Sequence, residues 1–213
     1  MDTQLHQHIS VALADSRDMC RSGLKCWLQK EPDITVIAEA GNTADLLEAV
    51  RTSMPDVVVL NMTLAERTAL DIVSLLRKEG NRSKIVVIGT DYSSIASIIN
   101  KTDAHAYIQQ DEKREVFISA VRHVVRHSDN VWLSPSAKKL QQDIANELKE
   151  LAFTPMEKKI LSHIDNNNQE IAQRLNLAVG TVRNHISNVY FRLNVPGRKE
   201  AIEAARRLGL IGT

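Results

Sequence analysis

The first 127 residues alternate short apolar runs with amphipathic segments. The apolar runs are short and uniform, which is typical of strands buried on both faces of a sheet. The expected strands are Ile9–Ala14, Ile34–Ala38, Val57–Leu60, Ile85–Ile88 and Ala106–Ile108. The expected helices between them are Met19–Leu28, Ala44–Arg51, Leu70–Arg77, Ile95–Asn100 and Glu115–Arg126. Five strand–helix repeats predict an α/β domain at residues 1–127, with a doubly wound, five-stranded parallel sheet.

After residue 127 the apolar positions keep helical spacing only. Residues 128–150 are expected to form a helical linker, which Ser134-Pro135-Ser136 is suited to begin. The apolar positions that follow at helical spacing are Leu140, Ile144, Leu148 and Leu151. Such a stripe more often packs in a core than forms an oligomer seam. Residues 151–213 are expected to form a second, all-α domain of four helices.

Within residues 169–189 the pattern predicts two helices joined by a tight turn. The apolar stripe of the second helix is Val182, Ile186, Val189 and Leu193. Its outward residues are Arg183, Asn184, Ser187 and Asn188. These are side-chain types that bond to base edges and phosphates, as in a DNA-reading helix-turn-helix. Any amphipathic helical hairpin has the same periodicity, so this pattern alone leaves a purely structural interpretation open.

The net charge of +1 is unevenly distributed along the chain. Residues 151–213 hold nine Lys and Arg against five Asp and Glu, a charge of +4. Residues 1–127 hold fifteen against seventeen, and residues 128–150 hold three against four, so the three regions sum to +1. The basic excess therefore lies where DNA binding is expected, and it is small enough that dimerisation would help binding.

Composition argues against several other classes of protein. No apolar run approaches the roughly 18 residues that a membrane helix needs, and Met1-Asp2-Thr3-Gln4 lacks a signal peptide's apolar core. We therefore expect a cytoplasmic protein without membrane contact. Cys20 and Cys26 lack the spacing of a metal or redox motif and are interpreted as packing residues. We expect no enzymatic activity, cofactor or metal, because the sequence lacks a glycine-rich phosphate loop, paired catalytic carboxylates and a nucleophile with a recognisable base.

The last 60 or so residues resemble the LuxR-type helix-turn-helix, over Leu151 to Ile211. The segments that carry the resemblance are Phe153-Thr154-Pro155-Met156-Glu157, Glu170-Ile171-Ala172, Gly180-Thr181-Val182, Asn184-His185 and Leu193-Asn194-Val195. The first segment also has a physical reason, since Thr154 and Glu157 can form a capping box around Pro155.

The resemblance implies roles for individual residues and a partner, double-stranded promoter DNA. Base contacts are implied for Arg183, Asn184 and Ser187, with Asn188 on the same face. Phosphate contacts are implied for Thr181, Arg192 and, more weakly, Lys199. The final helix implies dimer contacts through Ala201, Ile202, Ala205 and Leu208. We therefore expect a homodimer on a two-fold repeated site, with a heterodimer with another regulator as the alternative.

The helix-turn-helix segment departs from the family in two places. The stretch before Gln169 is about two residues short and lacks a glycine, so Asn166 or Asn167 is expected to take the left-handed conformation. Ala178 stands where a capping serine or threonine is usual, which should weaken the helix start by roughly 1 kcal/mol.

The first domain resembles the receiver of the NarL/FixJ response regulators, over Ile9 to Arg126. The segments that carry this resemblance are Val11-Ala12-Leu13-Ala14-Asp15, Glu31-Pro32-Asp33-Ile34-Thr35-Val36, Ala38-Glu39-Ala40 and Pro55-Asp56-Val57-Val58-Val59-Leu60. The likeness implies a flavodoxin-like receiver fold whose chemistry lies at the carboxyl ends of the strands.

At the chemical positions the receiver pattern breaks down. Asn61 stands at the place of the phosphorylated aspartate, and an amide is a poor nucleophile. The acidic pair that holds magnesium keeps Asp15 but has Ser16 in the second place. Gly89 replaces the hydroxyl residue, with Thr90 beside it, and Gln110 replaces the lysine. Tyr107 keeps the switch aromatic. The domain is interpreted as a pseudo-receiver that works without aspartate phosphorylation.

Three hypotheses describe what a pseudo-receiver would do. In the first, it is a constitutive dimerisation platform. In the second, it senses either a small ligand in the altered pocket or a protein partner on the face near Tyr107. In the third, the chain is mainly an adaptor that pairs with another regulator and reads little DNA itself.

Overall fold

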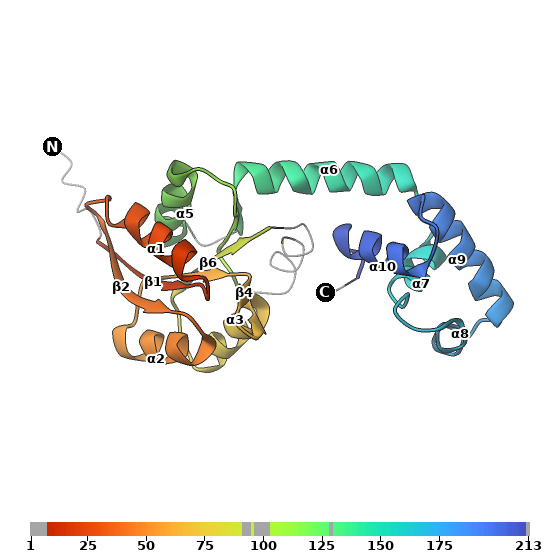
Figure 1. Cartoon of the computed structure of the whole chain (residues 1–213), viewed down its shortest axis with the longest axis horizontal. Coiled ribbons are helices and arrows are strands. Elements are labelled where there is room, and N and C mark those ends of the chain that lie inside the picture. Colours follow the sequence, from red (N-terminus) through yellow and green to blue (C-terminus); the bar gives the residue numbers. More distant parts are fainter. Residues whose placement is uncertain (1–7, 91–94, 96–102, 128–129, 212–213) are drawn as a thin grey trace. The chain divides into compact units, whose positions relative to one another are not determined.

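A computed structural model describes residues 8–90, 95, 103–127 and 130–211 of the 213-residue chain. The chain forms two compact units that divide between Lys138 and Lys139, inside helix α6 (Pro135–Leu151). Figure 1 labels their elements. Each unit has its own core, and each is described by itself below.

The first unit is built on a parallel sheet with the strand order β2-β1-β3-β6-β7-β8. The strands are β1 (Ile9–Ala14), β2 (Ile34–Ala40), β3 (Val57–Asn61), β6 (Lys84–Gly89), β7 (Ala106–Gln109) and β8 (Trp132–Leu133). The five expected strands are confirmed. The sixth, β8, adds two residues to the edge of the sheet by pairing with Ala106 and Tyr107, and it is too short to leave a pattern in the sequence.

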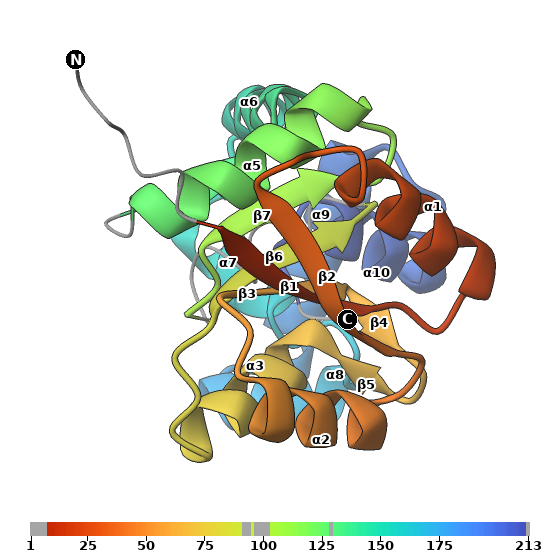
Figure 2. The same ribbon diagram turned by 90° about the vertical axis from the view of Figure 1, so that its left-hand side faces the viewer.

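Helices cover both faces of this sheet, as Figure 2 shows. They are α1 (Asp18–Leu28), α2 (Thr43–Ser53), α3 (Ala69–Lys78) and α5 (Arg114–Arg126). Helices α1 and α5 lie on one face, and α2 and α3 lie on the other. A small hairpin of β4 (Thr63–Leu64) and β5 (Arg67–Thr68) connects β3 to α3. The helix expected at residues 95–100 falls outside the described residues, except for Ile95, which is buried.

The core explains why the strand segments are uniformly apolar. All four residues of Val57–Leu60 are at most 1% exposed, because the helices bury both faces of the sheet. On one face Val57 and Val59 pack with Leu28 from α1 and Phe117 from α5. Each buried side chain of this size contributes about 1.5–3 kcal/mol to folding.

The second unit is helical. After α6 come α7 (Pro155–Leu161), α8 (Asn168–Leu175), α9 (Val179–Leu193) and α10 (Arg198–Arg207). The expected capping box at Thr154 and Glu157 is confirmed. The expectation of a left-handed residue at Asn166 or Asn167 is wrong, since neither has a positive φ. Asn167 is extended and caps α8 in a second capping box with Glu170, which removes the need for glycine.

Candidate nucleic-acid interface and the carboxyl edge of the sheet

Helices α8 and α9 are joined by a turn of three residues. Asn176 takes the left-handed conformation at φ 53°, and the N–H of Leu177 donates to the Ala172 carbonyl at 2.9 Å. This bond closes the end of α8. Ala178 begins α9 without a side-chain hydrogen bond, as expected for alanine at a cap.

The apolar stripe of α9 packs into the domain and orients the rest of the helix. Val182 and Ile186 pack with Ile160 of α7 and Ile171 of α8. Val189 packs in a second cluster around Phe153. The opposite side of α9 therefore faces away from the core.

That outward side brings together most of the expected DNA contacts. Thr181, Arg183, Asn184, Ser187 and Asn188 are all exposed on α9. Among the described residues the only hydrogen bond made by these side chains is from the Ser187 hydroxyl to the Arg183 carbonyl, at 3.1 Å. A guanidinium and two amides are thus free to bond to base edges or phosphates.

Arg192 does not join this free group. Its Nη1 donates to the Leu151 carbonyl at 3.0 Å, and its Nε lies 3.4 Å from Oε2 of Glu157. Burial would raise the pKa of the Glu157 carboxyl, but the hydrogen bonds of Thr154 and the charge of Arg192 lower that pKa overall. The family resemblance implies a phosphate contact for Arg192, whereas its partners here lie inside the domain.

Other cations of this unit also serve its structure. Arg198 donates to the carbonyl of Ile164 at 2.9 Å and to the Asn166 carbonyl and Asn168 side chain, which fixes the short loop before α8. Arg206 pairs with Asp165 and Arg207 with Glu147. Among residues 151–211, the cations for which the structure shows no such partner are Lys158, Lys159, Arg174, Arg183 and Lys199. Lys199 is exposed on α10, as expected for a phosphate contact.

The four residues expected to form a dimer contact are mostly core residues. Ala201 and Ala205 are 0% exposed and Leu208 is 1% exposed, and the two alanines belong to the core cluster around Phe153. Only Ile202 reaches the surface in part. Small apolar residues at helical spacing suit packing within a domain as well as between copies, and here they pack within the domain.

At the carboxyl edge of the sheet, Asp15 is held by a guanidinium. Arg17 donates from Nε to Oδ1 of Asp15 at 3.1 Å and from Nη2 to Oδ2 at 2.8 Å, and the Arg17 N–H also reaches Oδ1 at 2.9 Å. The Asp15 side chain is nearly buried, at 5% exposure. This hydrogen bond to Asp15 is the main reason that the pKa of Arg17 is raised. Arg17 is not among the residues predicted from the sequence, although a cation two residues after Asp15 is a signal that could have indicated this pair.

The remaining positions of this edge do not assemble a metal site. Ser16 is exposed, and Oδ1 of Asn61, at the end of β3, accepts the Thr63 N–H at 3.0 Å. With Asp15 already bonded to Arg17 and no second carboxylate, these residues do not fit a magnesium ion. In the described part of the chain no three carboxylate, imidazole or thiol side chains are grouped to hold a metal.

Gly89 and Tyr107 fit together through the absence of a side chain. A Cβ at Gly89 would lie 2.4 Å from the Tyr107 hydroxyl oxygen and 2.8 Å from its Cε2. Tyr107 is 0% exposed, so its ring fills the space above Gly89. A serine or threonine at position 89 would require this ring to move.

The last two positions of the edge are solvent-exposed. The Gln110 N–H donates to the Gly89 carbonyl at 2.8 Å, and its side chain provides no charge. The carbonyl of Thr90 accepts from Nε2 of Gln109 at 2.8 Å.

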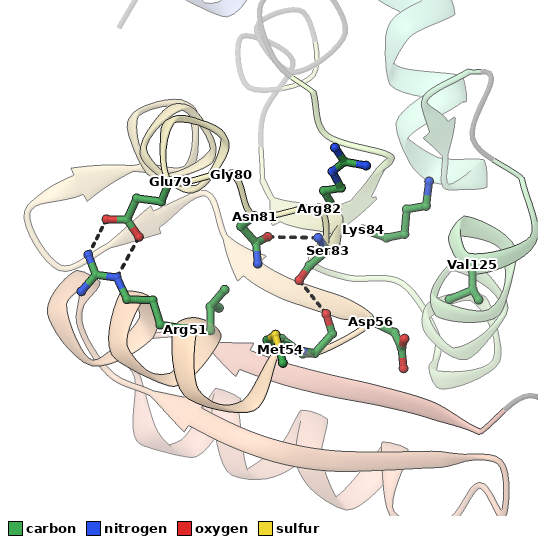
Figure 3. A pocket seen from close by; sticks show the side chains of 12 residues that line it. Arg51, Met54, Asp56, Glu79, Gly80, Asn81, Arg82, Ser83, Lys84 and Val125 are labelled. Atoms are coloured by element: carbon green, nitrogen blue, oxygen red, sulfur yellow. Dashed lines mark hydrogen bonds and ion pairs between the residues drawn. The ribbon is translucent and has the colours of Figure 1, made fainter.

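A pocket of about 620 Å³ lies at the opposite edge of the sheet, where the strands begin (Figure 3). On one side Arg51 pairs with Glu79. On the floor Ser83 donates to the Pro55 carbonyl at 2.6 Å, and its N–H donates to Asn81 at 3.0 Å. These groups bond to one another, and none belongs to the expected sites.

The fold and its two sites define a class: a regulator with a receiver-like domain and a helix-turn-helix. Comparison with known proteins gives the same class. Residues 11–122 match the model of the response regulator receiver domain, and residues 151–205 match that of the bacterial regulatory proteins of the luxR family. The chain therefore belongs to the response regulators that carry a luxR-type DNA-binding domain.

Similar proteins share this organisation along their whole length. The transcriptional regulatory protein DesR of Bacillus subtilis is 28% identical over 207 residues, covering 94% of this chain and 98% of DesR. The crystal structure of ChrA, from a heme-sensing two-component system, is 24% identical with a TM-score of 0.54 and covers 96% and 100%. RcsB of Salmonella enterica bound to the promoter rprA is 13% identical with a TM-score of 0.67 and covers 92% and 97%.

These findings define what kind of protein the chain is. Its curated relatives are transcriptional regulators, and the chain is a regulator of this kind rather than an enzyme. Within the residues that the structure describes, no helix has the length and apolar character to cross a membrane.

Proposed function

We propose that this response regulator binds promoter DNA as a dimer through α9 and acts without phosphorylation of its receiver. The observation that carries the second part is the Asp15–Arg17 pair. Both carboxylate oxygens are bonded to the guanidinium, at 3.1 and 2.8 Å. Phosphoryl transfer would need Asp15 to be free and an acceptor carboxylate at Asn61.

The other changes at this edge support the same conclusion. Charge-assisted bonds to a nearly buried carboxylate are stronger than neutral ones, so releasing Asp15 from Arg17 costs free energy. The Tyr107 ring fills the space where a hydroxyl residue would stand, and Gln110 brings no charge to pair with a phosphate. Restoring one position therefore leaves the others without function.

The DNA-binding part of the proposal rests on the free side of α9. Arg183, Asn184 and Asn188 are exposed, and their side chains make no hydrogen bond or ion pair among the described residues. Besides Arg183, four unpartnered cations of residues 151–211 remain for phosphates. This number is modest, so one copy binds weakly and two copies are needed for tight binding. We further propose a receiver-like domain at residues 1–127, a helical linker at residues 128–150 and a DNA-binding domain at residues 151–213. We also propose that the protein is cytoplasmic and that two copies bind a two-fold repeated site.

A direct test uses the full chain and duplexes selected from a random pool. Affinity for the selected site is measured for wild type and Asn61→Asp, with and without a small-molecule phosphodonor. We expect specific binding that the phosphodonor changes less than about twofold in both proteins. A phosphodonor-dependent rise in affinity of wild type would contradict phosphorylation independence. A rise in Asn61→Asp alone would mean that one residue separates this receiver from a working switch.

The second candidate function is an adaptor that pairs with another regulator. It is favoured by the four arginines of the second unit whose side chains are used internally, which lowers the charge left for DNA. Light scattering gives the oligomeric state, and the same duplexes give the affinity. Failure of the full chain to select any duplex at low salt would favour the adaptor.

A further inference from the structure

We propose that Phe191 is an apolar DNA contact that adds sequence preference beyond the polar residues of α9. The inference rests on the proposed DNA binding. Phe191 is 87% exposed, the most exposed of the large apolar side chains in the described part of the chain. Phe191 is not among the contacts predicted from the sequence, because its neighbours in the helix carry the expected polar chemistry.

Helix geometry puts Phe191 in the middle of the outward face. At about 100° per residue, Phe191 lies about 20° around the axis from Asn184, seven residues earlier. Ser187 and Asn188 lie about 40–60° to either side of Asn184 on the same scale. The buried residues Val182, Ile186 and Val189 occupy the opposite side of the helix. A surface that contacts Asn184 and Asn188 therefore also faces Phe191.

The neighbours of Phe191 leave it no partner inside the domain. Tyr190 turns inward and packs against both core clusters. Arg192 turns to Glu157 and the Leu151 carbonyl. The outward side of the last turn of α9 thus presents an aromatic ring and no cation. A contact between this part of the helix and DNA would therefore be apolar and not ionic.

DNA has apolar groups that suit such a ring. In the major groove the C5 methyl of thymine is the apolar feature that marks one base, and phenylalanine is among the side chains that contact it. Phe191 lies about 10 Å along the helix axis from Asn184. We therefore assign Phe191 to a thymine methyl beyond the Asn184 contact, toward the carboxyl end of α9.

The test compares wild type with Phe191→Ala and Phe191→Leu in the full chain, on a site selected by wild type. Met54→Ala is the matched control, because Met54 is 77% exposed in the first unit. We expect Phe191→Ala to bind about 5- to 20-fold more weakly and Phe191→Leu less than about fivefold. The slope of affinity against salt should stay unchanged, since each lost phosphate contact would lower it by about 0.9.

Replacing single thymines by deoxyuridine then locates the contact. One replacement should weaken wild type about threefold and leave Phe191→Ala unaffected. Equal affinity of Phe191→Ala and wild type would overturn the inference, as would weakening without any coupled thymine. Loss of dimers in Phe191→Ala without DNA would assign the ring to a second copy and also overturn it. Failure of wild type to bind any duplex would instead overturn the proposed function itself.

Discussion

The outward side of α9 and the carboxyl edge of the sheet stand where their folds place binding sites, yet they differ in what their polar groups do. On α9 a guanidinium and two amides are exposed and make no side-chain bond within the described residues. At the sheet edge Asp15 and Asn61 are bonded to neighbours of the same chain. Polar side chains without a partner can bond to a ligand, whereas those already bonded within the chain stabilise the fold. This difference is what supports our proposal of DNA binding through α9 without phosphorylation of the receiver.

Arg192 marks the limit of this contrast, because it belongs to α9 and yet acts as a structural residue. Arg192→Ala would leave the Glu157 carboxylate, 3% exposed, without its cation and remove a bond to the Leu151 carbonyl. We expect the free energy of unfolding of the second unit to fall by about 2–3 kcal/mol. Chemical denaturation followed by far-UV circular dichroism measures it.

Arg206→Ala is the control for this variant. Arg206 and Asp165 form an exposed pair at 3.4 Å, so its loss should cost less than about 1 kcal/mol. If Arg192→Ala were as stable as wild type and only weakened DNA binding for all sequences alike, Arg192 would be a phosphate contact as first expected.

Arg183 tests the free side of the comparison. Arg183→Ala should relax the preference at one base pair of the selected site, at a cost of about 1–3 kcal/mol on that site. The unfolding free energy should stay unchanged, because the Arg183 side chain makes no hydrogen bond or ion pair with the residues that the structure describes. Binding to a panel of single-base variants of the site measures the effect. Unchanged affinity and preference would show that α9 docks differently.

A substitution at Gly89 tests the carboxyl edge of the sheet, where the groups are packed and bonded within the chain. Gly89→Ala places a Cβ where the Tyr107 hydroxyl and ring now lie, so we expect the first unit to lose about 1–2 kcal/mol. Combining it with Tyr107→Ala should cost clearly less than the sum of the two single losses, because the smaller side chain removes the clash. Strict additivity would mean that the two positions are not coupled.

The sequence predicts the fold well because burial alone decides it. Apolar runs such as Val57–Leu60 and the stripe through Val182 and Ile186 report which side of an element is inside. They do not report which neighbour a polar side chain meets. The surface roles of Arg192 and Ala201 were implied by the family resemblance, and the neighbours that they meet here come from distant segments of the chain.

Local loop geometry hid the remaining features. Arg17 reaches Asp15 only because the chain turns between β1 and α1, which spacing does not reveal. Asn167 was expected to replace a glycine and instead caps α8. Phe191 was predictable, since helical spacing puts it beside Asn184, but an apolar residue on a polar face was not weighed as a contact.

Acidic pH should lower the stability of the first unit more than that of the second, because of His105. Burial and the charges of Lys84 and Arg77 lower the pKa of His105 to about 4, and its Nδ1 accepts the Ile85 N–H at 3.2 Å. The folded pKa is thus below the unfolded value of about 6.5, so this stability is complete above pH 6.5 and is lost as the pH falls toward 4. Because the His105 ring is partly exposed, we expect the first unit to lose about 1–2 kcal/mol over that window, less than the roughly 3 kcal/mol of the full shift.

The second unit should hold its stability over most of the same window, because the lowered pKa values of Glu147 and Glu157 matter only below about 4.5. The chain offers a clean readout, since both tryptophans, Trp27 and Trp132, belong to the first unit. Tryptophan fluorescence in denaturant at several pH values follows that unit alone, while circular dichroism follows both. His105→Gln should flatten the acid dependence of the fluorescence transition and leave the second unit unchanged. An unaltered acid dependence in His105→Gln would assign the sensitivity to other groups of the first unit.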